Sequence, residues 1–375
     1  MRNHVSAGED APHATPECRV RIGSPGSVLA VVPHLLGFMP GKSLVVLGAE
    51  PLTGEIKIVL RYDLPDPPDE DASHGIAVHA AEILTAQHAS HVLVVGYGTA
   101  RLVVPPADEV RAAVESGGLT VLDVLRVQDQ RYWSHLCTDP GCCPPEGTPF
   151  DPMSEPEWAR MTEAGTRVLS GRCELAATVA PLTGEAGDGA RRANLRAMQR
   201  ADKLVARVGR TGKRGEGRRI IAAAGISAVT QALAAYRSGR SVTNIDQLAW
   251  ITVVLRDLRV RDDAWARMDP AHRDAYLRIW TDVTRAARPG FVAAPASLLA
   301  FVAWQCGNGA LANVALDRAL DDNPRYSMAL LLRQVIDGGV PPTSARLPMS
   351  PEEVAASYDE IEGKRGREMA DTGAS

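Results

Sequence analysis

The side chains best suited to chemistry in this sequence lie between residues 131 and 150, RYWSHLCTDPGCCPPEGTPF. Three of the six cysteines fall here, Cys137, Cys142 and Cys143, and His135 stands two residues before the first of them. Thiolate and imidazole groups are ligands that zinc prefers, and zinc takes four ligands in a tetrahedron. The spacing C-x4-C-C supplies three sulfurs, so a metal site would take its fourth ligand from His135, Asp139 or a distant residue.

Two other interpretations of this segment stay open. One of its cysteines could act as a reactive or redox-sensing thiol, because the thiolate is the nucleophilic form of the side chain. Alternatively, the cysteines are small buried hydrophobic residues in a loop that its prolines and glycines shape. The remaining cysteines, Cys18, Cys173 and Cys306, stand alone in the sequence.

A second candidate site is expected where predicted strands end, because open α/β sheets bind ligands in the crevice outside their strand ends. The motif GYG closes one buried strand, but it lacks the third glycine of a dinucleotide fingerprint, and no helix is predicted directly after it. We expect a ligand-binding crevice lined by these residues: Arg61, Asp63, Gly96, Tyr97, Gly98, Arg101 and Trp133.

Residues 191–219 form a basic segment with 11 Lys/Arg against Asp202 and Glu216, a local net charge of +9. Such a segment could contact phosphates. However, no aromatic residue lies between Trp158 and Tyr236, so bases would find nothing to stack on. The rest of the chain carries −13, since −4 minus +9 is −13, and it offers this segment an acidic surface to dock on. Nucleic acid is therefore not the expected partner.

The elements that must position these residues divide the chain in two. Before residue 152, apolar strands alternate with helical patterns: a hairpin of 43–48 and 56–62, a helix over 72–88, a strand at 91–95, a helix from the two prolines at 105 and 106 to about 116, and strands at 119–127 and 129–136. This order predicts an α/β domain with a mostly parallel sheet and an antiparallel hairpin. We expect a disordered tail over 1–18, the α/β domain over 19–152, a helical domain over 153–346, and a C-terminal helix with a frayed tail over 347–375.

From residue 155 the hydrophobic period is that of helices. The predicted helices span 155–169, 172–180, 188–209, 217–238, 244–260, 270–287, 295–306, 309–321 and 325–337. Residues 293–326 resemble one tetratricopeptide-type helical hairpin, with small residues at Ala303, Ala312 and Ala319. A single such unit cannot bury its own face, so it is interpreted as structural core in preference to a peptide groove.

Composition restricts the class of protein. A chain of 375 residues with 45% hydrophobic and 23% charged residues is typical of a soluble protein of two domains. The net charge of −4 predicts no general affinity for nucleic acid or anionic membranes. The N-terminus shows no apolar leader, and six cysteines without one do not indicate a disulfide framework. We expect a cytoplasmic protein with reduced thiols and no membrane partner.

Four stretches occur in an order that resembles a known family: VLAVVPHLLGFMPGKSLVVLG (28–48), RYDLP (61–65), CTDPGCCPPEGTPF (137–150) and LLAFVAWQCGNGALANVALDRAL (298–320). Together they resemble an actinobacterial family called domain of unknown function 4192. The resemblance covers about residues 20–340, and CCPPEGTP is its most specific part. It implies a bacterial, cytoplasmic protein and brings no catalytic residues with it.

Three hypotheses of function follow. The first is a ligand-binding or protein-interaction protein whose partner is a small molecule or another protein. The second is an enzyme that uses Cys142 or Cys143 as a thiolate, or a metal held by the cysteine cluster, for which zinc is one candidate. The third is association with nucleic acid through residues 191–219.

Overall fold

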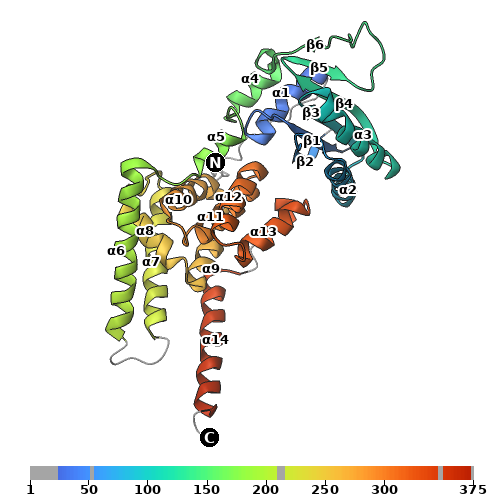
Figure 1. Cartoon of the computed structure of the whole chain (residues 1–375). Coiled ribbons are helices and arrows are strands. Elements are labelled where there is room, and N and C mark those ends of the chain that lie inside the picture. Colours follow the sequence, from blue (N-terminus) through green and yellow to red (C-terminus); the bar gives the residue numbers. More distant parts are fainter. Residues whose placement is uncertain (1–23, 51–54, 209–215, 345–348, 373–375) are drawn as a thin grey trace, which may run out of the picture. The chain divides into compact units, whose positions relative to one another are not determined.

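The structure, a computed structural model, describes residues 24–50, 55–208, 216–344 and 349–372, with side chains in the last range up to residue 361. The chain forms two compact units, Met1–Val168 and Leu169–Ser375 (Figure 1). The first unit contains a sheet with helices and the second is helical, as the sequence predicts. The predicted tail over 1–18 and residues 209–215 of the basic segment lie outside the described residues.

Six strands form the sheet of the first unit, in the order β2-β1-β3-β4-β5-β6. They span Ser43–Ala49 (β1), Ile56–Asp63 (β2), His91–Tyr97 (β3), Thr120–Gln128 (β4), Arg131–Ser134 (β5) and Thr148–Pro149 (β6). Within the described ranges, only β3 and β4 pair in parallel, and the other four pairings are antiparallel. The sheet is therefore mixed, and the prediction of a mostly parallel sheet is wrong.

The position of β1 explains the difference. Strands β2 and β3 both run antiparallel to β1 and flank it, so they are parallel to each other without being hydrogen-bonded neighbours. Helix α2 (Glu70–Ala86) makes the predicted crossover between them, but the crossover passes β1. The predicted hairpin of β1 and β2 is confirmed, as is the pairing of β4 with β5 through Asp129 and Gln130, which both have positive φ.

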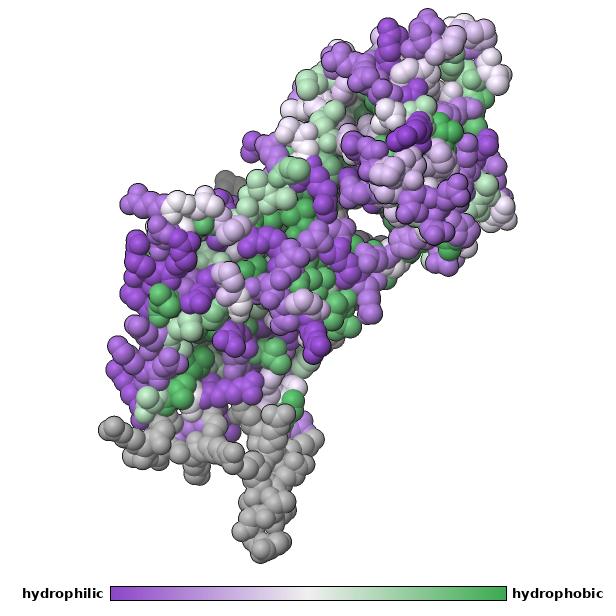
Figure 2. All heavy atoms as spheres, in the orientation of Figure 1, coloured by the Kyte–Doolittle hydropathy of each residue, from purple (hydrophilic) through white to green (hydrophobic). Residues whose placement is uncertain are grey.

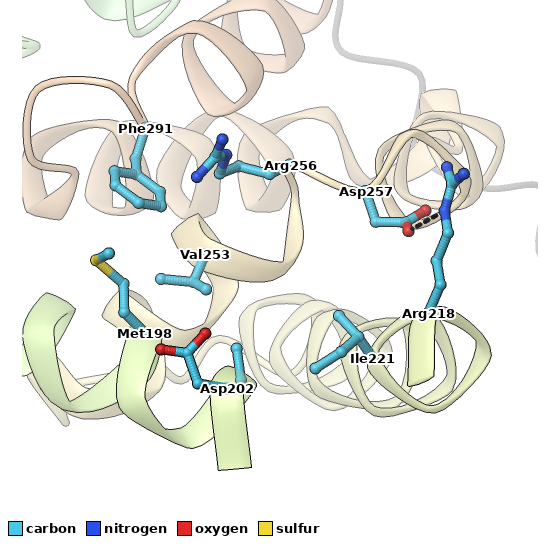
Figure 3. A pocket seen from close by; sticks show the side chains of 9 residues that line it. Met198, Asp202, Arg218, Ile221, Val253, Arg256, Asp257 and Phe291 are labelled. Atoms are coloured by element: carbon cyan, nitrogen blue, oxygen red, sulfur yellow. Dashed lines mark hydrogen bonds and ion pairs between the residues drawn. The ribbon is translucent and has the colours of Figure 1, made fainter. Parts of the chain in front are cut away.

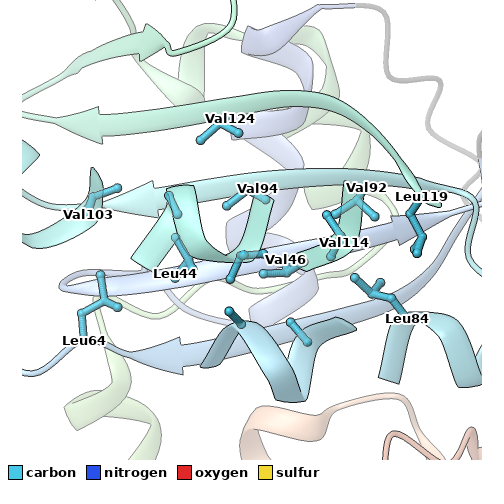
Figure 4. Close-up of a cluster of buried hydrophobic side chains, with 14 of the residues drawn as sticks. Leu44, Val46, Leu64, Leu84, Val92, Val94, Val103, Val114, Leu119 and Val124 are labelled. Carbon is cyan, nitrogen blue, oxygen red and sulfur yellow. The ribbon is translucent and has the colours of Figure 1, made fainter. Parts of the chain in front are cut away.

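Helices α2 and α3 (Ala100–Ser116) cover one face of this sheet (Figure 4). Alternate strand residues point towards them, because successive side chains of a strand face opposite sides. They include Leu44, Val46, Val92, Val94 and Val124. The residues between them, such as Val45 and Val95, are also buried. In Figure 4, α1 (Pro25–Leu36) passes behind the sheet, which makes the unit a three-layer α/β/α structure.

Helix α3 begins at Ala100, whereas the sequence predicts a start after Pro105 and Pro106. Tertiary packing decides the start, because Val103 is fully buried and lies against Gly96 at the end of β3. A Cβ atom on Gly96 would stand 2.0 Å from Cγ1 of Val103. Pro105 and Pro106 lie past the first turn of α3, where each removes one backbone hydrogen bond and crowds the carbonyl four residues earlier, so the packing of the helix must offset a local cost.

Helix α4 (Pro156–Glu163) belongs to the first unit. The imidazole of His34 in α1 lies edge-on to the ring of Trp158 in α4, with the ring centroids 4.4 Å apart. Nδ1 of His34 is 2.7 Å from Oγ1 of Thr166, just beyond α4. Through these contacts α4 packs with the first unit. The first unit therefore ends at Val168, whereas the sequence suggests a boundary at 152.

The second unit consists of helices and short 3₁₀ turns. The helices are α5 (Arg172–Thr178), α6 (Gly184–Val208), α7 (Glu216–Arg237), α8 (Ile245–Val254), α9 (Leu258–Ala266), α10 (Arg273–Ala286), α11 (Ala293–Gln305), α12 (Gly309–Asp322), α13 (Ser327–Asp337) and α14 (Pro351–Thr372). Helix α11 is buried at every residue from Ala293 to Trp304, which makes it the central helix of the unit. The hairpin that it forms with α12 is thus core, while its tetratricopeptide character stays a prediction.

Helix α7 is, among the described residues, the one helix long and apolar enough to cross a membrane. Core helices of soluble proteins pass the same test. Helix α7 contacts α6, α8, α9 and α10, and Gly225 lies close to Val254 and Val260. Figure 2 shows hydrophobic and hydrophilic residues mixed over the visible surface of this unit. One face of α7 therefore packs into the helical unit, and the cytoplasmic location stays a prediction.

Candidate functional site

The cysteine loop, residues 135–147, connects β5 to β6 and is anchored at both ends. At its start, Oγ of Ser134 accepts a hydrogen bond from the backbone N–H of Cys137 (3.0 Å) and donates one to Oδ1 of Asp123 (2.7 Å). At its end, Nη1 of Arg131 donates to the carbonyl oxygen of Gly147 (2.7 Å). The loop therefore has a defined path set by contacts with the sheet.

Trp133 of β5 provides a third anchor. Its indole N–H donates to the carbonyl oxygen of Pro145 (3.0 Å), and its ring stacks under the guanidinium of Arg126, 3.7 Å from the centroid. Gly147 has φ +84°, and a Cβ atom there would stand 2.4 Å from Cε2 of Trp133. Only glycine fits this position without a shift, because both the conformation and the ring exclude a side chain.

A tight turn inside the loop brings the three thiols together. The backbone N–H groups of Cys142 and Cys143 both donate to the carbonyl oxygen of Asp139, at 3.1 and 2.7 Å, and the N–H of Gly141 donates to the Asp139 carboxylate (2.8 Å). As a result, the Sγ atoms of Cys137, Cys142 and Cys143 all lie within 4.8 Å of one another. Cys142 is exposed, and the other two are half-buried.

The thiols share their protons unequally. The pKa of Cys137 is lowered, first by a hydrogen bond from the thiol of Cys143 and then by one from the backbone N–H of Asp139. The same hydrogen bond to Cys137 is the main cause that raises the pKa of Cys143 to about 12. The hydrogen bond between these two thiols therefore favours the thiolate on Cys137, and Cys143 stabilises its charge as a donor.

His135 lies outside the group of three sulfurs. Burial is the largest cause that lowers its pKa, and the charges that act on the ring belong to Asp108 in α3, Arg126 and other residues of that face. The Asp139 carboxylate is held by the N–H of Gly141. Among the described residues, no fourth His, Cys, Asp or Glu donor joins the three sulfurs.

The predicted crevice residues at the ends of β2 and β3 lie on one sheet edge. Asp63 and Tyr97 are in register across Ser43, so both strands end together. Arg61 pairs with Asp63 (Nη2 to Oδ1, 2.5 Å), and its guanidinium lies 5.3 Å from the ring centroid of Phe38. The guanidinium of Arg61 is therefore engaged by Asp63 and by the ring of Phe38.

The remaining residues of this edge have structural surroundings. Gly96 leaves room for Val103, and the buried hydroxyl of Tyr97 has no hydrogen-bond partner in the part of the chain that the structure describes. Helix α3 does open directly after Gly98, contrary to the sequence prediction. Arg101 is exposed and stands 3.7 Å from Asp66. The edge therefore gathers the predicted residues, but the structure supplies a packing reason for most of them.

The described arginines of the basic segment largely contact the second unit itself. Arg196 donates two hydrogen bonds to Asp246 (2.8 and 2.6 Å) in α8. Arg200 lies 4.2 Å from the ring centroid of Trp250, and Nε of Arg218 is 2.8 Å from Asp257. These contacts agree with docking on an acidic surface.

The sequence gives no indication of a pocket of about 400 Å³ in the second unit (Figure 3). Its apolar wall includes Met198, Val253 and Phe291, and the Arg256 guanidinium lies 5.2 Å from the centroid of the Phe291 ring. At the same pocket, Arg218 and Asp257 form an ion pair with each other. Its walls come from α6, α7, α8 and the segment before α11, so no local motif could have predicted it.

Comparison with known proteins adds an identity to this geometry. No curated protein and no solved structure is significantly similar to the chain. The model of the family described as "Domain of unknown function (DUF4192)" matches residues 25–343, a range that includes the cysteine loop and reaches from α1 to the 3₁₀ turn after α13. Because this match covers most of the sequence, the chain belongs to the family Domain of unknown function (DUF4192).

Proposed function

We propose that the first unit binds one thiophilic metal ion, such as zinc, through the thiolates of Cys137, Cys142 and Cys143. The observation that carries the proposal is the convergence of the three Sγ atoms to within 4.8 Å of one another on one anchored loop. Zinc–sulfur bonds of about 2.3 Å place tetrahedral sulfur ligands about 3.8 Å apart, so the sulfurs need to move by only about 1 Å.

The local electrostatics support this proposal. The Asp139 N–H that bonds to the sulfur of Cys137 is the kind of outer contact that orients a metal ligand and stabilises its charge. Metal binding displaces the protons of the thiols, so affinity rises with pH. The loop is anchored by Trp133 and Arg131 independently of any ion. These contacts hold the loop that carries the three sulfurs.

The test is the metal content of reduced, purified protein, measured by mass spectrometry before and after incubation with zinc. We expect one equivalent in the native sequence and none in a Cys142→Ser/Cys143→Ser variant. Cys173→Ser is the matched control, because Cys173 is exposed but lies in the other unit. Absence of bound metal from the zinc-treated native protein would refute the proposal.

The same cluster supports a second candidate, a reactive thiol at Cys137, whose pKa is lowered by two hydrogen bonds. Alkylation by iodoacetamide, followed by peptide mass spectrometry, separates the two. A metal site predicts that zinc protects all three cysteines together. A reactive thiol predicts fast modification of Cys137 that zinc leaves unchanged.

The other sequence hypotheses remain proposals of lower rank. The internal contacts of the basic segment favour a structural role over nucleic-acid binding. The short connection between α11 and α12 and the small residues Ala303 and Ala312 support a tetratricopeptide-like hairpin that serves as core. Reduced thiols, which the metal site requires, fit a cytoplasmic location.

A further inference from the structure

The three-sulfur group leaves one coordination position to be filled. Among the described residues, no fourth His, Cys, Asp or Glu donor lies with the sulfurs: His135 is not part of the group, and the Asp139 carboxylate accepts the N–H of Gly141. Cys142 is exposed, as are the turn residues from 138 to 141 that precede it. A four-coordinate ion held here would thus direct one position towards solvent, as exchangeable sites do.

Charge decides what suits that position. Three thiolates give a divalent ion a net negative charge and donate electron density to it. Zinc lowers the pKa of its bound water to about 7 when its protein ligands are three neutral histidines. Three thiolates weaken this effect, so hydroxide generation and hydrolysis are disfavoured. A fourth sulfur instead completes the four-sulfur set that zinc adopts in its most stable sites.

We infer that the open position takes the sulfur of a small exogenous thiol, so that this site binds thiol compounds as metal thiolates. The inference rests on the proposed function, since it requires the bound ion. The exchange balances as metal–OH₂ + RSH → metal–SR⁻ + H₂O + H⁺, with no change of oxidation state. The ion thereby lowers the pKa of the bound thiol and holds it as a nucleophilic thiolate at neutral pH.

The test uses the full chain loaded with Co²⁺, reduced with a phosphine so that no other thiol is present. The visible d–d bands of Co²⁺ report the number of sulfur ligands. We titrate with 2-mercaptoethanol and, as the matched control, with ethylene glycol, which replaces the sulfur by oxygen. We expect a saturable spectral change with the thiol alone. At ten times its dissociation constant, the thiol should tighten apparent metal binding about tenfold.

The outcomes separate this inference from the proposed function. If no Co²⁺ binds, the proposed function itself fails. If Co²⁺ binds and 2-mercaptoethanol leaves the bands unchanged, the metal site stands and the thiol inference is overturned. His135→Ala and Asp139→Asn then show whether either side chain fills the fourth position, because loss of a ligand alters the spectrum before any thiol is added. A four-sulfur spectrum without thiol, in protein that elutes as a dimer, would also overturn it and assign the position to a second copy.

Discussion

Replacing Gly147 by alanine tests whether the contact with Trp133 holds the cysteine loop in place. A left-handed backbone costs a residue with a Cβ about 1–2 kcal/mol. The new Cβ would also stand 2.4 Å from Cε2 and 2.6 Å from Cζ2 of Trp133. Trp133 cannot move away without weakening its hydrogen bond to Pro145 and its stacking on Arg126. Overpacking of this kind costs about 1–3 kcal/mol more, and we therefore expect Gly147→Ala to lower the free energy of unfolding by about 2–5 kcal/mol in total.

Gly118→Ala is the matched control. Gly118 has φ +81°, close to that of Gly147 and in the same unit, but a Cβ there would meet nothing within 4 Å. It should therefore lose only the backbone contribution of about 1–2 kcal/mol. Native-state hydrogen exchange of the β4 and β5 amides measures the opening free energy of the first unit separately from the helical unit. Equal losses in the two variants would refute the reasoning, because the ring contact would then contribute nothing.

The remaining predictions concern packing and pH. The buried Nε2 of His34 finds no hydrogen-bond partner among the described residues, and burial lowers the pKa of the ring below its ordinary 6.5. Because the unfolded chain binds this proton more readily than the folded one, the free energy of unfolding should fall as the pH drops below 6.5 and should not vary with the titration of His34 above it. Urea unfolding of the native sequence and of His34→Gln measures this effect, and a difference between them that does not change with pH would contradict it. Asp322→Ala should cost about 1–3 kcal/mol in thermal unfolding, because the carboxylate accepts three backbone N–H groups at the start of α11, whereas the exposed neighbour Asp321→Ala should cost almost nothing. Gly96→Ala should lose about 1–3 kcal/mol through overpacking against Val103, and adding Val103→Ala should restore part of the loss relative to Val103→Ala alone; additive losses would rule out the contact.

The cysteine loop could be selected from sequence because its signal is local. Three cysteines within seven residues, together with turn formers, mark a segment that can bring side chains together without help from distant parts of the chain. The structure confirms that Cys137, Cys142 and Cys143 converge. The sequence indicates that Gly147 shapes the loop, but it does not predict the contact of Gly147 with Trp133 or the hydrogen bond of Ser134 to Asp123, because these partners are distant in the chain.

His135 illustrates the limit of such local reasoning. Two residues from Cys137, it was the natural choice for a fourth ligand. Its backbone N–H, however, bonds to the carbonyl oxygen of Val124, and His135 does not join the group of three sulfurs. The short distance in sequence predicts that His135 is a ligand. In the structure, the β4–β5 pairing continues through the backbone of His135. The boundary of α3 changed for a similar reason, because the contact of Val103 with Gly96 outweighs the local signal of two prolines.

By itself, the sequence determined the alternation of strands and helices, the two hairpins, the helical second half and the loop on which thiols gather. These features follow from hydrophobic periodicity and turn chemistry, which act between residues a few positions apart. Only the tertiary structure decided that β1 lies between β2 and β3, that α4 joins the first unit through His34, and that four separate segments of the second unit line one pocket. Such choices depend on which buried faces fit together across long stretches of chain, and no short pattern of residues encodes that fit.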